Sequence, residues 1–139
     1  MTFSSAEPAT RQSNAEILAG AYQALAAGDV PTVLAALSDR ITWRISGRSP
    51  LSGRYYGIDE VVGFFQAIGE RSNGTFRLEI HEILAGTGDT VAALVTEKAE
   101  RGGAVLADAA VHVWRFEDGR AVAFQAFTGD EHAQDAFWS

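Results

Sequence analysis

Four stretches in the second half of the chain alternate apolar and polar residues, the period of a β-strand with one buried face. They are TFRLEIHEIL (75–84), TVAALVTEKAE (90–100), AVLADAAVHVWRFE (104–117) and RAVAFQAFTG (120–129). Arg101-Gly102-Gly103 is expected to form a turn, and Asp118-Gly119 is a strong hairpin signal. The pattern therefore predicts an antiparallel meander. The alternation slips near Glu82, which predicts a bulge in the first of these strands.

The first half of the chain has helical periodicity instead. Apolar residues recur every three or four positions between Asn14, which can cap a helix, and Gly28, which can end it. Asp29 can cap a second short helix, and 58–74 has the pattern of a third. The expected buried side of the second helix is Val30, Val33, Leu34 and Leu37.

Three further segments complete the prediction. RITWRIS (40–46) alternates as a strand, and the turn residues of 47–57 indicate a loop. The last ten residues are expected to form a short tail or a helical turn carrying Phe137 and Trp138.

Helices followed by paired strands predict an α+β fold. We expect three N-terminal helices packed on a strongly curved, mostly antiparallel sheet that forms a cone with an internal pocket. A chain of 139 residues suits one domain, so we assign 14–139 to the domain and 1–13, which is small and polar, to a flexible tail.

Composition narrows the function classes. The chain has no cysteine, which excludes disulfides and thiolate catalysis, and its net charge of −7 without a block of like charges argues against nucleic acid as a partner. The N-terminus lacks the layout of a signal peptide, and no apolar run is long enough to span a membrane. We therefore expect a cytoplasmic protein without a membrane partner.

Two segments carry a family resemblance: AYQALAAGDVPTVLAALSDRITWRISGRSPLSGRYYGIDEVVGFF (21–65) and VHVWRFEDGRAVAFQAF (111–127). They resemble the SnoaL-like branch of the nuclear transport factor 2-like superfamily. The resemblance covers roughly 14–138 and implies a bacterial protein with a cone-shaped fold and a pocket for a small molecule. The family includes ketosteroid isomerases, limonene-epoxide-hydrolase-like enzymes, polyketide cyclases and proteins without catalysis, so the fold alone does not assign an activity.

The ketosteroid isomerase triad is not preserved at the matching positions. The resemblance places its tyrosine at Ala21, one residue from Tyr22, its base at Arg44 and its second aspartate at His112. Because arginine cannot act as a base at neutral pH, steroid isomerisation by that mechanism is not expected.

The resemblance also implies which strand residues look into the pocket. We expect His112 to be the acid/base, because an imidazole transfers protons in both directions near neutral pH. The alternative is a histidine that lines the pocket and serves packing or ligand fit. The ligand-binding residues implied on the same concave face are Val95, Ala110, Trp114, Phe124 and Thr128.

Glu97 and Asp108 are candidate partners of His112. If the turn at 101–103 is a tight hairpin, paired residue numbers sum to roughly 205, so Glu97 faces Asp108 and His112 faces Ala93. Either carboxylate could orient His112 or serve as the base itself, and their opposition would raise one pKa. The alternative is that both are ordinary surface charges.

Only one of Trp43 and Arg44 can face inward, and the sequence leaves both options open. Arg44 inside could hold an anionic substrate or pair with a carboxylate, whereas Trp43 inside would line the cavity. Tyr22 could donate to a ligand oxygen or pack in the core, and Tyr56 could rim the mouth of the pocket. His81 and His132 are expected to be exposed.

The histidines are scattered, so we predict no metal, and the absence of nucleotide-binding and serine-hydrolase motifs predicts no cofactor. The opposite face of the sheet is apolar as well, which predicts a homodimer through that outer face. The residues of this face are Ala92, Leu94, Ala109, Val111, Val113, Ala123 and Phe127.

These observations lead to one working hypothesis and two alternatives. The hypothesis is a cofactor-free enzyme that acts on an apolar oxygenated small molecule by proton transfer or ring opening or closure, as an isomerase, cyclase or epoxide-opening hydrolase. The first alternative is a non-catalytic small-molecule binder that uses the same pocket. The second is a dimeric interaction module whose cone is filled.

Overall fold

The computed structural model describes residues 12–139, so nearly all of the predicted 1–13 tail lies outside the described residues. Helices α2 (Asn14–Ala26) and α3 (Val30–Ala35) come first, followed by strands β1 (Leu37–Ile45) and β2 (Gly53–Tyr56) and helix α4 (Gly57–Arg71). Strands β3 (Arg77–Ala85), β4 (Thr90–Arg101), β5 (Ala104–Glu117) and β6 (Arg120–Thr128) precede helix α5 (Glu131–Trp138).

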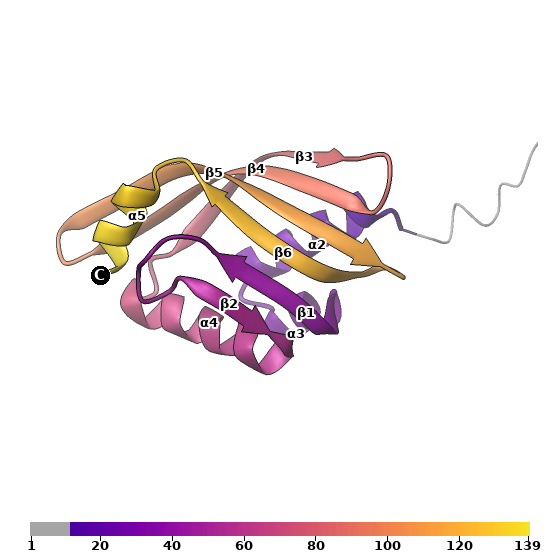
Figure 1. Cartoon of the computed structure of the whole chain (residues 1–139), viewed down its shortest axis with the longest axis horizontal. Helices are drawn as coiled ribbons and strands as arrows, with labels where there is room; N and C mark the ends of the chain where they lie inside the picture. Colours follow the sequence, from indigo (N-terminus) through magenta and orange to yellow (C-terminus); the bar gives the residue numbers. More distant parts are fainter. Residues whose placement is uncertain (1–11) are drawn as a thin grey trace, which may run out of the picture.

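The strands form one six-stranded sheet in the order β2-β1-β6-β5-β4-β3. The β1–β6 pair is parallel, and the other neighbouring pairs are antiparallel. The sheet curves over the helices, with α4 beneath β1 and β2, α2 behind the meander, and α5 at one end of it (Figure 1). This arrangement confirms the predicted α+β class with a curved, mostly antiparallel sheet.

The meander follows the sequence pattern closely. Gly102 and Gly103 form the β4–β5 turn with positive φ angles, as do Asp118 and Gly119 in the β5–β6 turn. The register of β3 against β4 shifts between Ile80 and Glu82, which confirms the predicted bulge. Because side chains alternate across a strand, this register fixes which residues face the helices.

The first half differs from the prediction in three places. Helix α2 is capped by Ser13 rather than Asn14, because Ser13 and Glu16 bond each other's backbone amides in a capping box. The predicted loop 47–57 contains β2, which gains backbone hydrogen bonds by pairing with β1. Val30, the first residue of α3, is 40% exposed. Leu37 is the first residue of β1, because α3 ends at Ala35.

The hydrophobic core lies between the concave face of the sheet and the helices. Alternate residues of β4 and β5 are buried along the length of both strands. Aromatic side chains fill the part of this core under β1 and β6, where the rings of Trp43 and Phe124 stack with centroids 4.0 Å apart. Polar side chains interrupt the same face at Glu97, Asp108 and His112.

Candidate functional site: a cavity with a buried polar cluster

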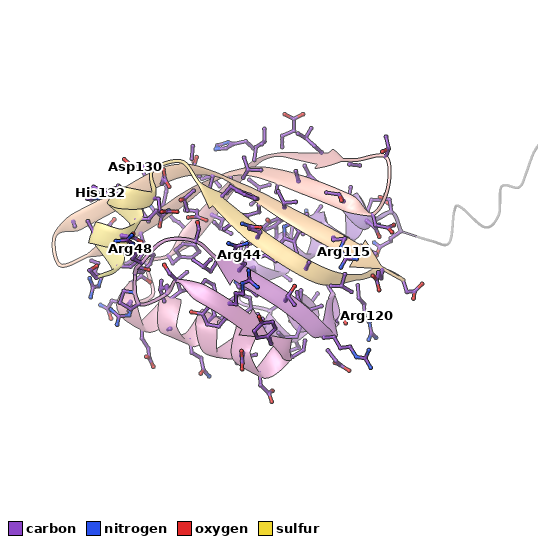
Figure 2. The ribbon with its side chains drawn as sticks, viewed as in Figure 1. Arg44, Arg48, Arg115, Arg120, Asp130 and His132 are labelled. Atoms are coloured by element: carbon purple, nitrogen blue, oxygen red, sulfur yellow. The ribbon has the colours of Figure 1, made fainter. Side chains whose placement is uncertain are left out.

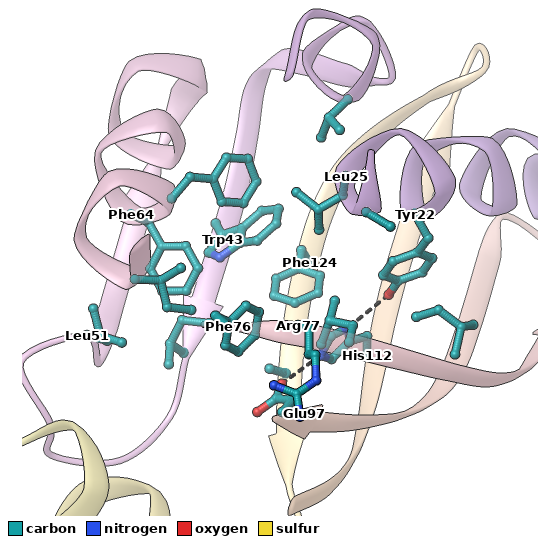
Figure 3. A pocket seen from close by; sticks show the side chains of 18 of the residues that line it. Tyr22, Leu25, Trp43, Leu51, Phe64, Phe76, Arg77, Glu97, His112 and Phe124 are labelled. Carbon is teal, nitrogen blue, oxygen red and sulfur yellow. Dashed lines mark hydrogen bonds and ion pairs between the residues drawn. The ribbon is translucent and has the colours of Figure 1, made fainter. Parts of the chain in front are cut away.

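A cavity of about 770 Å³ lies under the concave face of the sheet (Figure 3). Its size is in the range of small-molecule sites, and its wall is mostly apolar. The wall comes from helices α2, α3, α4 and α5 and from strands β1, β3, β4, β5 and β6. The aromatic residues that line it are Tyr22, Trp43, Phe64, Phe65, Phe76, Trp114, Phe124 and Trp138.

Five polar side chains meet at one wall of this cavity, and we call Tyr22, Glu97, Asp108, His112 and Gln134 the polar cluster. Their residues are each at most 8% exposed. All but Asp108 line the cavity. The cluster joins residues from α2, β4, β5 and α5, so it depends on the complete fold.

The predicted register of β4 against β5 is confirmed, since Glu97 pairs with Asp108 and Ala93 pairs with His112. Both carboxylates are only 8% exposed, which rules out the alternative that they are ordinary surface charges. Asp108 lies on the predicted face but does not line the cavity, because its carboxylate is held against Gln134 of α5.

His112 bonds a partner with each ring nitrogen. Its Nδ1 lies 2.8 Å from the Tyr22 hydroxyl, and its Nε2 lies 2.8 Å from Glu97 Oε2. The Trp114 indole N–H donates to the Tyr22 oxygen over 3.0 Å. Tyr22 is therefore the junction between the α2 helix and the two strand residues, as Figure 3 shows for Tyr22 and His112.

Hydrogen-bond matching assigns the protons in this chain. An ionised carboxylate only accepts, so His112 donates its Nε2–H to Glu97. Tyr22 then donates its O–H to Nδ1, which accepts because the neutral imidazole carries one proton. With His112 in this neutral tautomer, each donor among Trp114, Tyr22 and His112 has an acceptor. A protonated imidazole would leave the buried Tyr22 O–H without an acceptor among these residues, at a cost of about 1–3 kcal/mol.

The environment of Tyr22 supports its role as a donor. Burial raises the pKa of the Tyr22 hydroxyl far above its ordinary value, and the negative charge of Glu97 raises it further. The hydrogen bond from Trp114 lowers it, but burial dominates. Tyr22 therefore keeps its proton at neutral pH, and both roles considered for it, core packing and ligand contact, are compatible with its position.

Gln134 is the member of the cluster that the sequence analysis did not find. Its amide nitrogen donates to Glu97 Oε1 over 2.7 Å and to Asp108 Oδ2 over 2.9 Å. The Trp138 indole donates to Gln134 Oε1 over 2.9 Å, which fixes the orientation of the amide. The sequence offers only a weak signal for its burial. Asp130 can cap a helix, and Gln134 lies three and four positions before Phe137 and Trp138, so the three share one side of α5, which the structure buries.

Trp43 rather than Arg44 faces inward. Trp43 is 5% exposed, lines the cavity and pairs with Phe124 across the β1–β6 ladder. Alternation then turns Arg44 to the outer face beside Gln125, where it is exposed (Figure 2). The assignment of Arg44 to the site is therefore wrong. Within residues 12–139, the Trp43 indole N–H is the one buried side-chain donor without a hydrogen-bond partner.

The predicted ligand-binding residues divide into two groups. Trp114, Phe124 and Thr128 line the cavity. Val95 and Ala110 lie on the concave face but are covered by neighbouring side chains, at 1% and 6% exposure, and do not reach the cavity.

Tyr56 also falls outside the site. It is 55% exposed at the junction of β2 and α4, because the loop expected at the mouth forms a strand that directs it to solvent. Tyr56 therefore does not rim the cavity, contrary to the prediction.

The remaining histidines and charges lie away from the cavity. His81 and His132 are exposed as predicted, and His81 bonds Thr96 on the outer face. In the part of the chain that the structure describes, no three histidine, aspartate or glutamate side chains are grouped closely enough to hold a metal ion. No helix among the same residues is long and apolar enough to cross a membrane.

Comparison with known proteins identifies the family. Residues 18–124 match the model described as the SnoaL-like domain, which is more than half of the chain. The protein therefore belongs to the SnoaL-like family, as its sequence motifs predicted. This family includes polyketide cyclases and isomerases.

Two solved structures confirm the fold, and neither their descriptions nor that of a curated relative names an activity. An uncharacterized protein of Mycobacterium tuberculosis is 23% identical over 130 residues, which cover 94% of this chain and 99% of the relative. The structure of Bal32a, from a soil-derived mobile gene cassette, has a TM-score of 0.88 and 28% identity, covering 91% of this chain and 96% of Bal32a. A protein of unknown function with a cystatin-like fold from Xanthomonas campestris has a TM-score of 0.87 and 29% identity. The match covers 92% of this chain and 99% of the Xanthomonas protein.

Proposed function

We propose that this protein is a cofactor-free enzyme that moves a proton on an apolar, oxygenated small molecule held in the cavity. One observation carries the proposal: a hydrogen-bonded Tyr22–His112–Glu97 chain is buried in the wall of an otherwise apolar cavity. Buried polar groups are costly unless they are paired, and a paired imidazole and carboxylate in the wall of an apolar cavity is an arrangement that acid/base chemistry uses.

The geometry makes His112 act through Tyr22. Both imidazole nitrogens are engaged, so the substrate meets the Tyr22 oxygen rather than a free ring nitrogen. When a substrate group gives its proton to this oxygen, Tyr22 passes its own proton to Nδ1, and Glu97 balances the imidazolium that forms. Tyr22 is neutral before and after the step, which agrees with the raised pKa of its hydroxyl. The reverse sequence returns the proton to another atom of the substrate, as an isomerase or cyclase requires.

Solvent isotope exchange tests this proposal before the natural reaction is known. Small aromatic alcohols and ketones that bind would be incubated with the protein in D₂O, and exchange of their carbon-bound protons followed by NMR. We expect wild type to catalyse exchange, and His112→Gln to bind the same compounds while losing about 10²–10⁴ in rate. Undiminished exchange by His112→Gln would remove His112 from the mechanism, and His132→Gln on the exposed face of α5 is the matched control.

A non-catalytic small-molecule binder is the second candidate. The engagement of both His112 nitrogens favours it, because a fully paired histidine also serves to fix the shape of a binding site. Tight binding without exchange or conversion of any bound compound would support this candidate over the enzyme. Whichever applies, a cytoplasmic location and the absence of a cofactor stay predictions.

We also propose that the outer face of the sheet pairs with a second copy of the chain. This face keeps Ala92, Leu94, Val111 and Val113 partly exposed, and Phe127 is 50% exposed. A self-complementary contact between two such sheets would cover them. Sedimentation should report a dimer, and Val111→Lys, which places a charge at the centre of this face, should convert it to a monomer; a monomeric wild type would contradict the proposal.

A further inference from the structure

We propose that the polar cluster selects ligands that carry a hydrogen-bond donor, such as a phenolic or enolic hydroxyl or an N–H, over ligands that offer only a carbonyl or ether oxygen. The proposal rests on the proposed function, because it concerns the same cavity, and it adds the chemical class of the group that the cavity recognises.

Each N–H and O–H of the cluster already has an acceptor within the protein. Tyr22 donates to His112, and His112 donates to Glu97. Both hydrogens of the Gln134 amide are used, one on Glu97 and one on Asp108. The two indoles are also engaged, Trp114 with the Tyr22 oxygen and Trp138 with the Gln134 oxygen. Within the polar cluster a ligand carbonyl would therefore find no free donor; the unpaired indole N–H of Trp43 belongs to the aromatic part of the cavity, under β1 and β6.

What remains unused on this wall is acceptor capacity. The Tyr22 oxygen accepts one hydrogen bond, from Trp114, and keeps room for another. Each Glu97 oxygen accepts one, whereas a carboxylate accepts about four in total. A hydroxyl or N–H on the ligand can donate to these free lone pairs. Such a group also supplies the proton that the substrate gives to the Tyr22 oxygen in the proposed reaction.

The charge of the cluster favours the same class. Glu97 and Asp108 bring two carboxylates to one wall, and neither forms an ion pair with a lysine or arginine among residues 12–139. Arg77 also lines the cavity, where one of its guanidinium N–H groups donates to the Thr75 carbonyl. Next to the two carboxylates themselves, a neutral donor is a better match than an anion.

Three naphthalenes of similar shape test the proposal: 2-naphthol, 2-methoxynaphthalene and 2-acetonaphthone. The first offers an O–H, and the other two offer only acceptors. Their dissociation constants would be measured by calorimetry at pH 8.0, above the ordinary titration range of an imidazole. We expect 2-naphthol to bind at least tenfold more tightly than either analogue.

Two variants locate the preference. Glu97→Gln replaces an acceptor with an amide that has its own donors, so the advantage of 2-naphthol should fall at least threefold and 2-acetonaphthone should gain affinity. Tyr22→Phe removes the other acceptor and tests the same point if Glu97→Gln does not fold. His132→Gln, which changes an exposed side chain of the same helix as Gln134, should keep the wild-type preference.

The outcomes separate this inference from the proposed function. If all three probes bind with similar affinity, or the ketone binds most tightly, the donor preference is wrong while the cavity remains a small-molecule site. If none of the three binds to wild type, both the inference and the small-molecule function are contradicted. A preference for 2-naphthol that survives unchanged in both Glu97→Gln and Tyr22→Phe would overturn the assignment to the polar cluster.

Discussion

Glu97 and Lys98 are neighbours in one strand, yet they belong to two different electrostatic environments. Glu97 faces the helices and bonds His112 over 2.8 Å, in side chains that are 11% and 6% exposed. Lys98 faces outward and pairs with Glu79 over 2.7 Å, in side chains that are 29% and 49% exposed. The distances are almost equal, so distance alone does not distinguish the pairs.

Burial makes the difference between them. On the outer face water solvates both partners whether or not they meet, so the Lys98–Glu79 pair adds little to stability. On the inner face the two side chains are largely shielded from water, so each polar group depends mainly on its partner in the protein. The inner pair is therefore a constraint on structure and protonation, while the outer pair is a solvated contact on the same strand.

The largest effect should come from Glu97→Leu, which keeps the approximate volume and removes the acceptor of both His112 and Gln134. Breaking one side of a buried pair should lower the free energy of unfolding by about 3 kcal/mol or more. Urea denaturation measures the change. Loss of less than about 1 kcal/mol would show that the inner pair behaves like a surface contact.

Gln134→Met should rank next. It leaves the two opposed carboxylates without their shared donor and the Trp138 indole without its acceptor. We expect a loss of about 2 kcal/mol in the same urea experiment, with His132→Gln within about 0.5 kcal/mol of wild type. Adding Asp108→Leu to Gln134→Met should restore part of the lost stability, because it removes one of the two carboxylates that no longer have a donor. If the losses of the two single variants simply add, Gln134 does not act as the donor that Glu97 and Asp108 share.

The pH dependence of Tyr22 gives a third test. Burial raises the pKa of its hydroxyl in the folded state, so above pH 10 the unfolded chain releases a proton that the folded protein retains. The contribution is fully present below pH 10 and is lost as pH rises, by about 1.4 kcal/mol per pH unit. The difference in unfolding free energy between wild type and Tyr22→Phe should therefore shrink from pH 9.5 to 11. Tyr55, present in both proteins, cancels in this difference.

The smallest effect should come from Glu79→Gln on the outer face. The hydrogen bond from Lys98 lowers the pKa of Glu79, so its contribution exists above the ordinary carboxyl range and fades as pH falls. Because the pair is solvated, we expect no measurable change in melting temperature at pH 7. If urea denaturation shows that Glu79→Gln loses as much unfolding free energy as Gln134→Met, the two faces of the sheet do not differ as described.

The sequence predicted the meander well because period-two alternation and tight glycine turns are local signals. Those signals alone predict the pairing of Glu97 with Asp108, which the β4–β5 register confirms. Trp43 and Arg44 show the limit of local reasoning: the alternation allowed either orientation, and the stacking of Trp43 on Phe124 from a distant strand selected one. The family match alone placed Arg44 inside, which the structure contradicts.

Gln134 shows a second limit. A glutamine in a short polar segment resembles many exposed glutamines, and its burial depends on how α5 packs against β5. For Tyr56 the prediction erred in the opposite direction, toward the site. Its turn-rich segment suggested a loop at the mouth of the pocket, but the segment forms β2 and Tyr56 is exposed. In both cases tertiary contacts, rather than residue type, decided the outcome.

The hydrogen bonds from Tyr22 to His112 and from Trp114 to Tyr22 span 90 and 92 positions of the chain. Closing so long a loop costs conformational entropy, so the α2–β5 contact is expected late in folding rather than in an early local nucleus. A compound that binds the cavity then recognises only the finished native state. Its presence should slow unfolding and raise the midpoint of denaturation by mass action, so resistance to unfolding becomes a screen for the missing substrate.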